Sequence, residues 1–284
     1  MRNEIVPLHY PCGNSWSGMF LVLRESGNIL IDTAFAPSIE NLLLPALARR
    51  GMTPDDIDFV INTHMHADHF SGNAPFKKIS KAALAAFELS APKLRDPYPS
   101  MNAIRSKFAP ELPFVPIAPG IASMEPDLIL KDGDHLGDLM IVHTPGHDND
   151  SICLFDERTG ILFSGDSLQG VGTPSSGVAF YQSRAEYLYT LDTVEKLDVK
   201  KILAGHPFHP TDGTIDDVSG FMKLCRETVW KYDEVLKDAG KTCTTMPEFV
   251  KYLLKEAGIE QNPSVPVLTW HTVATHLEFL NNNE

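Results

Sequence analysis

The chain has 284 residues, of which 43% are hydrophobic and 21% charged, and its formal net charge is -13. A chain of this size and composition can bury the core of one large domain or two small ones. The negative charge disfavours polyanionic partners, so neither nucleic acid nor an anionic membrane is expected to bind. The first residues lack the pattern of a secretion signal and no apolar run is long enough to span a membrane, which favours a cytoplasmic protein.

The four cysteines form no recognisable redox or metal-binding motif. Cys12, Cys153, Cys225 and Cys243 lie far apart in the sequence, without a CxxC pair. Thiolate zinc sites and dithiol redox motifs place two cysteines close together. We therefore expect these thiols to be buried or incidental.

Strands and helices are expected to alternate in the first part of the chain. Apolar runs at 19–24 and 28–32 flank a short Gly-containing turn, the pattern of two strands joined by a hairpin. The leucines of 38–49 predict a helix with a kink at Pro45. The strand expected at 57–61 leads directly into a cluster of histidines.

The same order of elements is expected again in the second half. Strands are predicted at 140–143, 151–155, 160–164 and 201–204, and a helix at 185–197 precedes the last of them. Beyond these elements, helices are predicted at 215–237, 246–257 and 267–280. We expect a catalytic domain over 1–210 and a helical C-terminal extension over 211–284 that packs on it.

The segment 81–126 separates the two halves and has a different composition. It is rich in Ala, Pro, Phe and Met, with a predicted helical start at 81–89 and no clear strand. We interpret it as an insertion that covers the functional site. Six of its apolar side chains are candidates for a substrate channel, with simple packing onto the fold as an equal alternative for each: Phe87, Tyr98, Met101, Ile104, Phe108 and Phe114.

The densest group of metal-binding residue types is the segment 64–69, HMHADH, directly after a predicted strand. Alternating side chains after a strand end can direct His64 and His66 at one point, and Asp68 and His69 at a second point nearby. Polar residues at a helix start are the alternative, but three histidines and an aspartate in this pattern favour metal binding. One short segment is thus predicted to serve two metal ions.

Further ligands are required, because two histidines do not complete a tetrahedral site. Three residues meet this need, each placed directly after a glycine at the end of a predicted strand: His147, Asp166 and His206. Taken singly, each would more often be an ordinary turn residue. Together with the segment 64–69 they predict a two-metal site.

This order of motifs, HxHxDH followed by His, Asp and a final His, resembles the metallo-β-lactamase superfamily over about residues 19–209. The resemblance implies an α+β fold, the four-layer αβ/βα sandwich, in which two β-sheets face each other and helices lie outside. It also implies a distribution of ligands: His64, His66 and His147 on the first metal, Asp68, His69 and His206 on the second, and Asp166 bridging both.

The donor set and the motif type indicate a hydrolase. Histidine and carboxylate ligands suit Zn²⁺, with Fe, Mn, Ni or Co as alternatives. Two such ions make a water reactive at neutral pH, with Asp68 both ligating and orienting it, so that no protein nucleophile is needed. The sequence of 165–169, GDSLQ, lacks the final glycine of a serine-hydrolase elbow.

The expected substrate is a small molecule with an ester, lactone or thioester group. Within the superfamily this motif type is shared by thioesterases resembling glyoxalase II, by lactonases and by processing nucleases, and the acidic charge disfavours the last. Amide hydrolysis of the β-lactamase kind is an alternative, although the broadest class of zinc β-lactamases has a Cys ligand and lacks the histidine found here at His69. The loop 170–181 follows Asp166 closely, which makes Tyr181 a candidate for assisting an oxyanion.

Two other classes of protein are alternatives. One is a metal-binding effector protein in which hydrolysis is vestigial. The other is a diiron protein that reduces oxygen, which His66 disfavours because such relatives typically have Glu at this point of the motif. The oligomeric state stays open, with a homodimer among the alternatives.

Overall fold

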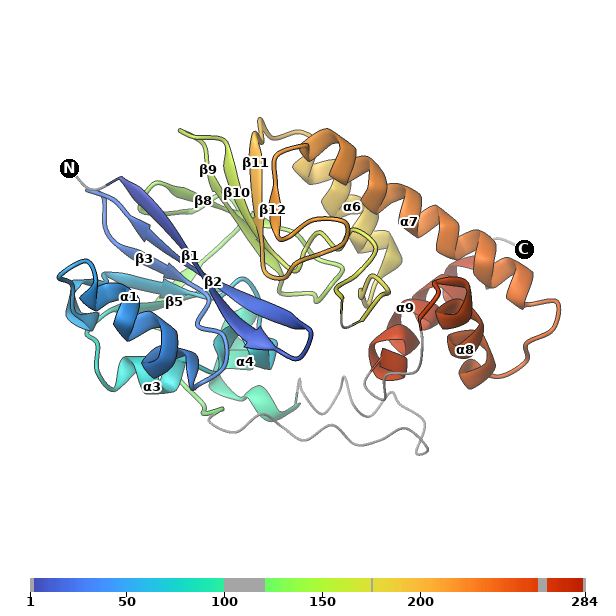
Figure 1. The fold of residues 1–284 in the computed structure, drawn as a ribbon, viewed down its shortest axis with the longest axis horizontal. Coiled ribbons are helices and arrows are strands. Elements are labelled where there is room, and N and C mark those ends of the chain that lie inside the picture. Colours follow the sequence, from blue (N-terminus) through green and yellow to red (C-terminus); the bar gives the residue numbers. More distant parts are fainter. Residues whose placement is uncertain (1–2, 100–120, 175, 260–264, 283–284) are drawn as a thin grey trace.

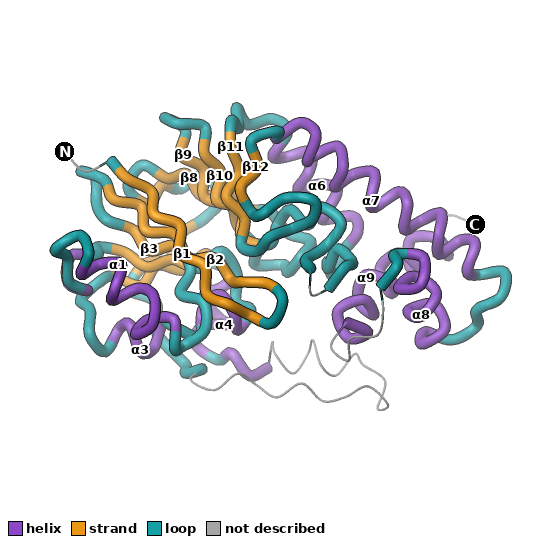
Figure 2. Tube along the Cα trace, in the orientation of Figure 1, coloured by secondary structure: helices purple, strands orange, loops and turns teal. Residues whose placement is uncertain are grey.

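The protein is built from two β-sheets that face each other, with helices on the outer surface of each (Figures 1 and 2). The computed structural model describes residues 3–99, 121–174, 176–259 and 265–282. This arrangement is the four-layer αβ/βα sandwich that the sequence predicts, so the expected fold class is confirmed.

The first sheet has the strand order β1-β2-β3-β4-β5-β6. Its strands are Glu4–Cys12 (β1), Ser15–Leu23 (β2), Ile29–Ile31 (β3), Phe59–Ile61 (β4), Ala83–Phe87 (β5) and Leu128–Leu130 (β6). The pairs β1-β2 and β2-β3 are antiparallel, whereas β3 to β6 run parallel to one another.

The second sheet has the order β12-β11-β10-β9-β8-β7. Its strands are His135–Leu136 (β7), Leu139–His143 (β8), Ile152–Asp156 (β9), Ile161–Gly165 (β10), Lys201–Ala204 (β11) and Thr214–Ile215 (β12). Because β9 is antiparallel to both β8 and β10, and β10 is parallel to β11, the strands β8, β10 and β11 all end at the same edge. The strand β12 lies beyond residue 210, so this sheet takes a short strand from the predicted C-terminal extension.

Helices cover the outer faces of both sheets. The first half contributes Ile39–Leu43 (η1), Leu44–Ala48 (α1), Pro54–Asp56 (η2), Ala67–Phe70 (α2), Asn73–Lys77 (α3) and Ser90–Arg95 (α4). The second half contributes Arg184–Val194 (α6), Val218–Ala239 (α7), Met246–Glu256 (α8) and Val265–Asn281 (α9). Figure 1 shows α6 and α7 beside the second sheet and the pair α8-α9 beyond them, below the far end of α7. No helix in the described part of the chain has the length and apolar character needed to cross a bilayer.

The strand β2 illustrates how the core holds the layers together. Its alternate side chains Phe20 and Val22 pack between the two sheets, while Met19, Leu21 and Leu23 pack under the helices of the first half. All five are almost completely buried. Burial of each such side chain contributes about 1.5–3 kcal/mol, so this strand belongs to two apolar layers at once.

Among the described residues, five strands were not predicted from the sequence: β1, β5, β6, β7 and β12. The expected helical start at 81–89 is wrong, because Ala83–Phe87 is the buried strand β5 between β4 and β6. The sequence ALAAF favours a helix by propensity, but packing on both faces of the sheet overrides that preference. The strand β1 was not predicted, since Pro7 and Pro11 interrupt its pattern, and prolines are tolerated there because β1 is an edge strand.

Candidate metal centre

Seven histidine and aspartate side chains meet where strands of both sheets end. The segment 64–69 follows β4 of the first sheet and continues into α2. The other three side chains follow β8, β10 and β11 of the second sheet, which end at the same edge: His147, Asp166 and His206. The structure therefore brings together all the metal ligands predicted from the sequence.

The first cluster consists of His64, His66 and His147, whose donor atoms lie within 4.8 Å of one another. The Nε2 atom of His147 lies 3.2 Å from Nε2 of His64 and 2.9 Å from Nδ1 of His66. Three converging imidazole nitrogens are a donor set that catalytic zinc sites use while one position stays open for water.

The second cluster consists of Asp68, His69 and His206. The Nε2 atom of His206 lies 3.4 Å from Nε2 of His69 and 3.2 Å from Oδ2 of Asp68. This cluster has one carboxylate and two imidazoles, a donor set that also suits a divalent ion.

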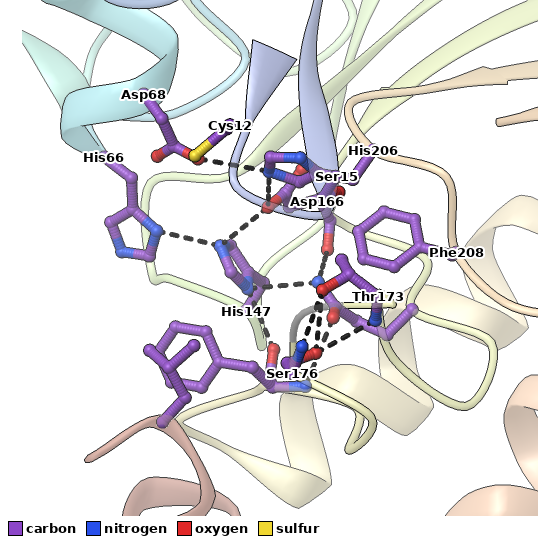
Figure 3. A pocket seen from close by; sticks show the side chains of 13 residues that line it. Cys12, Ser15, His66, Asp68, His147, Asp166, Thr173, Ser176, His206 and Phe208 are labelled. Atoms are coloured by element: carbon purple, nitrogen blue, oxygen red, sulfur yellow. Dashed lines mark hydrogen bonds and ion pairs between the residues drawn. The ribbon is translucent and has the colours of Figure 1, made fainter. Parts of the chain in front are cut away.

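Asp166 lies between the two clusters (Figure 3). Its Oδ2 atom is 3.2 Å from Nε2 of His206 and 3.6 Å from Nε2 of His147. Its Oδ1 atom is buried, lies 3.4 Å from Nε2 of His69, and has no hydrogen-bond partner. A buried carboxylate oxygen without a partner is costly unless a cation neutralises it. The residues present therefore fit divalent metal ions.

The two clusters differ in electrostatic character. Burial lowers the pKa of His147 to about 4 and holds that of His64 well below the usual value. Burial would also lower the pKa of His206, but the carboxylates of Asp166 and Asp68 outweigh it and raise that pKa to about 10. Because a histidine must be neutral to bind a metal, His64 and His147 are ready for ligation, whereas ligation by His206 would release a proton.

Three of the histidines are fixed by hydrogen bonds on the side away from the cluster. The Nδ1 atom of His147 donates to the carbonyl of Phe180 at 2.8 Å, and Nδ1 of His206 donates to the carbonyl of Trp16 at 2.5 Å. In the same way Nδ1 of His69 donates to Oδ2 of Asp32 at 2.9 Å. Such bonds set the tautomer and direct Nε2 at the metal.

Sequence reasoning missed Asp32 as a functional residue. This buried carboxylate also accepts hydrogen bonds from the backbone N–H of Thr63 at 2.8 Å and from its hydroxyl at 2.9 Å. Asp32 has a φ of 55°, an uncommon conformation for a residue other than glycine. The available signal was an aspartate at the end of a predicted strand, the same position that identifies the ligands.

The glycines that precede the ligands are required by close packing. A Cβ atom at Gly205 would lie 2.4 Å from Oδ1 of Asp166 and 2.8 Å from Cε1 of His69. At Gly165, which has a φ of +47°, a Cβ atom would lie 2.4 Å from the hydroxyl oxygen of Thr63. The pattern of strand, glycine and ligand thus reflects how closely the strand ends approach one another.

A cavity of about 210 Å³ opens onto the ligands (Figure 3). Besides the ligands, its walls comprise a polar group, Ser15, Gln169, Thr173 and Ser176, the thiol of Cys12, and an apolar group, Phe180, Phe208 and Leu268. Burial, and then the nearby carboxylate of Asp68, raise the pKa of the Cys12 thiol, which disfavours the reactive thiolate. The cavity therefore combines predicted metal ligands with both apolar and polar lining residues.

Tyr181 lies away from this cavity. Its side chain is fully buried and its hydroxyl is 2.7 Å from Nε2 of His276 on α9. The expectation that Tyr181 assists an oxyanion is therefore not met, and the neighbouring Phe180 lines the cavity instead.

The predicted apolar channel of the segment 81–126 is not supported by those of its residues that the structure describes. Phe87 packs between the two sheets, and the side chain of Tyr98 is 44% exposed at the surface. The other four residues proposed for the channel lie outside the described residues: Met101, Ile104, Phe108 and Phe114.

Comparisons with known proteins agree with this geometry. The family model described as the metallo-beta-lactamase superfamily matches residues 16–206. Human acyl-coenzyme A thioesterase MBLAC2 is 32% identical over 218 residues, which cover 69% of this chain and 75% of the relative. Hydroxyacylglutathione hydrolase from Brucella ovis is 24% identical over 246 residues, covering 85% of this chain and 77% of the relative.

Solved structures have the same fold. A metallo-beta-lactamase family protein from Thermus thermophilus has a TM-score of 0.78 at 22% identity, covering 99% of this chain and 93% of its own. The metallo-beta-lactamase GOB-18 from Elizabethkingia meningoseptica has a TM-score of 0.56 at 20% identity, covering 83% and 94%. With the family model matching most of the sandwich, this chain belongs to the metallo-β-lactamase superfamily of metallo-hydrolases.

Proposed function

We propose that the protein is a dinuclear hydrolase that attacks the carbonyl carbon of a thioester, ester or lactone. The observation that carries this proposal is the position of Asp166. Its Oδ2 atom lies 3.6 Å from Nε2 of His147 in the first cluster and 3.2 Å from Nε2 of His206 in the second, while its Oδ1 atom has no hydrogen-bond partner. A single structural ion would not require seven donors divided into two adjoining groups.

The roles of the residues follow from their positions. His64, His66 and His147 would hold one ion, and Asp68, His69 and His206 the other, with Asp166 shared between them. When bound, two divalent ions, which we propose to be zinc, lower the pKa of a water and polarise the carbonyl under attack.

Asp68 has a second task in this proposal. Its side chain is 28% exposed and lines the cavity, and its Oδ2 atom accepts a hydrogen bond from the hydroxyl of Ser17 at 3.3 Å. A carboxylate in this position would ligate an ion, orient the attacking water and accept a proton from it. Gly165 and Gly205 allow the strand ends around Asp68 to approach closely, because a Cβ atom at either glycine would clash with a neighbouring residue.

The cavity walls support an acyl substrate. Phe180, Phe208 and Leu268 give an apolar surface for the acyl group, while the hydroxyl of Ser15, which lines the cavity and has no hydrogen-bond partner, can bond a polar leaving group. The names of the relatives, an acyl-coenzyme A thioesterase and a hydroxyacylglutathione hydrolase, favour a thioester among the three bond types.

A substrate panel on zinc-loaded protein tests the proposal. The panel comprises an acyl-coenzyme A, a hydroxyacylglutathione, an acyl-homoserine lactone, an aryl ester and a chromogenic cephalosporin. We expect turnover of at least one thioester or ester, loss of turnover with a chelator, recovery with zinc, and slow or no cephalosporin cleavage. Faster cleavage of the cephalosporin would instead favour amide hydrolysis.

Metal analysis tests the foundation of the proposal. We expect two ions per chain, and fewer in His66→Ala, which lacks a ligand of the first cluster. Two bound ions with no turnover of any substrate would favour the effector protein with vestigial hydrolysis, and bound iron with oxygen consumption would favour the diiron protein. Absence of metal from the unchanged protein would contradict all three.

A further inference from the structure

A buried ionic network lies behind His66, on the side away from the cavity. The ammonium group of Lys93, on α4, lies 2.7 Å from Oδ1 of Asp148 and 2.7 Å from Oδ1 of Asp150. The other oxygen of Asp148, Oδ2, lies 3.3 Å from Nε2 of His66. The exposed fractions of the Lys93, Asp148 and Asp150 side chains are 14%, 10% and 0%. Three charged groups are thus largely withdrawn from water beside one predicted ligand.

His66 is oriented differently from the histidines whose outer nitrogen is Nδ1. Its Nδ1 atom faces the cluster, 2.9 Å from Nε2 of His147, and its Nε2 atom faces outward. For Nδ1 to bind a metal, the ring proton must be on Nε2, a buried atom that has no hydrogen-bond partner and lies 3.3 Å from Oδ2 of Asp148. The carboxylate is therefore at the position from which it can select this tautomer.

The rest of the network fixes that carboxylate. Lys93 contacts Oδ1 of Asp148 and leaves Oδ2 for His66. Asp150 anchors the ammonium group from the other side, and its Oδ2 atom accepts a hydrogen bond from the hydroxyl of Ser90 at 2.9 Å. Because two carboxylates share one ammonium, a negative charge remains beside the ring N–H of His66, which strengthens the imidazole as a ligand.

We propose that Asp148, held by Lys93, is a positioning residue for His66 and thereby makes zinc binding at the first cluster depend on α4. The inference rests on the proposed function in requiring that the first cluster bind a metal. It adds a residue that is not itself a ligand, together with a link from the segment that follows β5 to the metal centre.

The test is zinc affinity, measured by competition with a chromogenic chelator, in the full chain and in Asp148→Asn. We expect the variant to lose about 10- to 100-fold in affinity at one of two sites. Substitution by Co²⁺ should give an altered absorption spectrum in the same variant, because the orientation of one ligand changes. Asp148→Glu, which keeps the carboxylate, should recover part of the affinity, and Lys93→Met should weaken binding in the same direction.

Asp156→Asn is the matched control. Asp156, the last residue of β9, is also buried and pairs with Arg24 at 3.0 Å. The variant therefore breaks an ion pair outside the network. We expect it to lower thermal stability without changing zinc affinity. If Asp148→Asn fails to fold, Asp148→Glu and Lys93→Met carry the test by the same readout.

The outcomes separate this inference from the proposed function. If the unchanged protein binds no metal, the proposed function itself fails. If it binds two zinc ions and Asp148→Asn binds both with unchanged affinity and an unchanged Co²⁺ spectrum, the function stands and the positioning role is overturned. The same loss of affinity in Asp156→Asn would also overturn it, since the effect would then be one of general stability.

Discussion

Gly205 has space for a hydrogen atom but not for a methyl group, because Asp166 and His69 lie on the side where a Cβ atom would project.

The metal ligands could be predicted from the sequence, since the segment HMHADH is dense in metal-binding residue types and the later ligands each follow a strand and a glycine. Asp148 and Lys93 could not, because they are 55 residues apart and meet only when α4 packs against the loop after β8.

Gly205→Ala is predicted to disturb the metal centre while leaving the fold intact. The added methyl group must displace the Asp166 carboxylate or the His69 ring, and a shift of about 1 Å can cost roughly 100-fold in rate. Zinc content and kcat/KM measure the effect. Gly240→Ala is the control, since a Cβ atom there has no neighbour closer than 3.4 Å; equal behaviour of the two variants would contradict the prediction.

Tyr181→Phe is predicted to change stability and not catalysis. The lost hydroxyl leaves Nε2 of the buried His276 without its partner, at a cost of about 1–3 kcal/mol. Urea unfolding should therefore give a lower midpoint, while kcat/KM stays the same. A large fall in kcat/KM at full zinc content would show instead that the hydroxyl acts at the site.

Buried polar contacts connect the helix α9 to α7 and to the loop that follows β10. Asp233 of α7 accepts a hydrogen bond from Nδ1 of His276 at 2.7 Å and pairs with Arg184 at 2.6 Å. The hydroxyl of Thr272 on α9 donates to the carbonyl of Ala179 at 2.9 Å, next to Phe180 of the cavity wall. The position of this helix therefore bears on the shape of the cavity.

Asp233→Asn is predicted to loosen α9. Removing one charge of a largely buried pair costs about 3–5 kcal/mol, because the remaining charge is left uncompensated. We expect faster proteolytic cleavage near the C-terminus and a higher KM with a smaller change in kcat, since Leu268 of α9 lines the cavity. Cleavage and KM equal to those of the unchanged protein would contradict this role for α9.

Secondary structure was predictable where local pattern and tertiary packing agree. The strand expected at 201–204 coincides with β11, and the helices expected at 246–257 and 267–280 correspond to α8 and α9. The alanine-rich strand β5 was missed because its β conformation depends on neighbouring strands that lie far away in the sequence. Pairing partners of this kind cannot be read from a local window.

At the scale of the whole molecule, the metal centre joins the two halves of the sandwich. His64, His66, Asp68 and His69 follow the first sheet, and His147, Asp166 and His206 follow the second. Each of the two predicted ligand sets draws on both sheets. A bound ion therefore adds a connection between two layers that also meet through apolar packing and through polar contacts such as the ion pair of Arg24 with Asp156.

Metal removal is predicted to destabilise the whole protein. A ligand that binds only the folded state adds about 2.7 kcal/mol of stability per site at 100 times its Kd. We expect the thermal midpoint to fall on treatment with a chelator and to rise again with zinc, by an amount that depends on zinc concentration. An unfolding midpoint that is insensitive to zinc, in protein shown to contain two ions, would contradict a metal link between the sheets.

The order of the ligands along the chain has a consequence for biosynthesis. A ribosome that has released residues 1–143 has supplied every ligand from the first sheet and none from the second. In the order of synthesis, the first ligand set becomes complete at His147 and the second only at His206, which follows the end of β11. Neither ligand set can therefore be supplied by the first half of the chain alone, and the second set requires every residue up to His206.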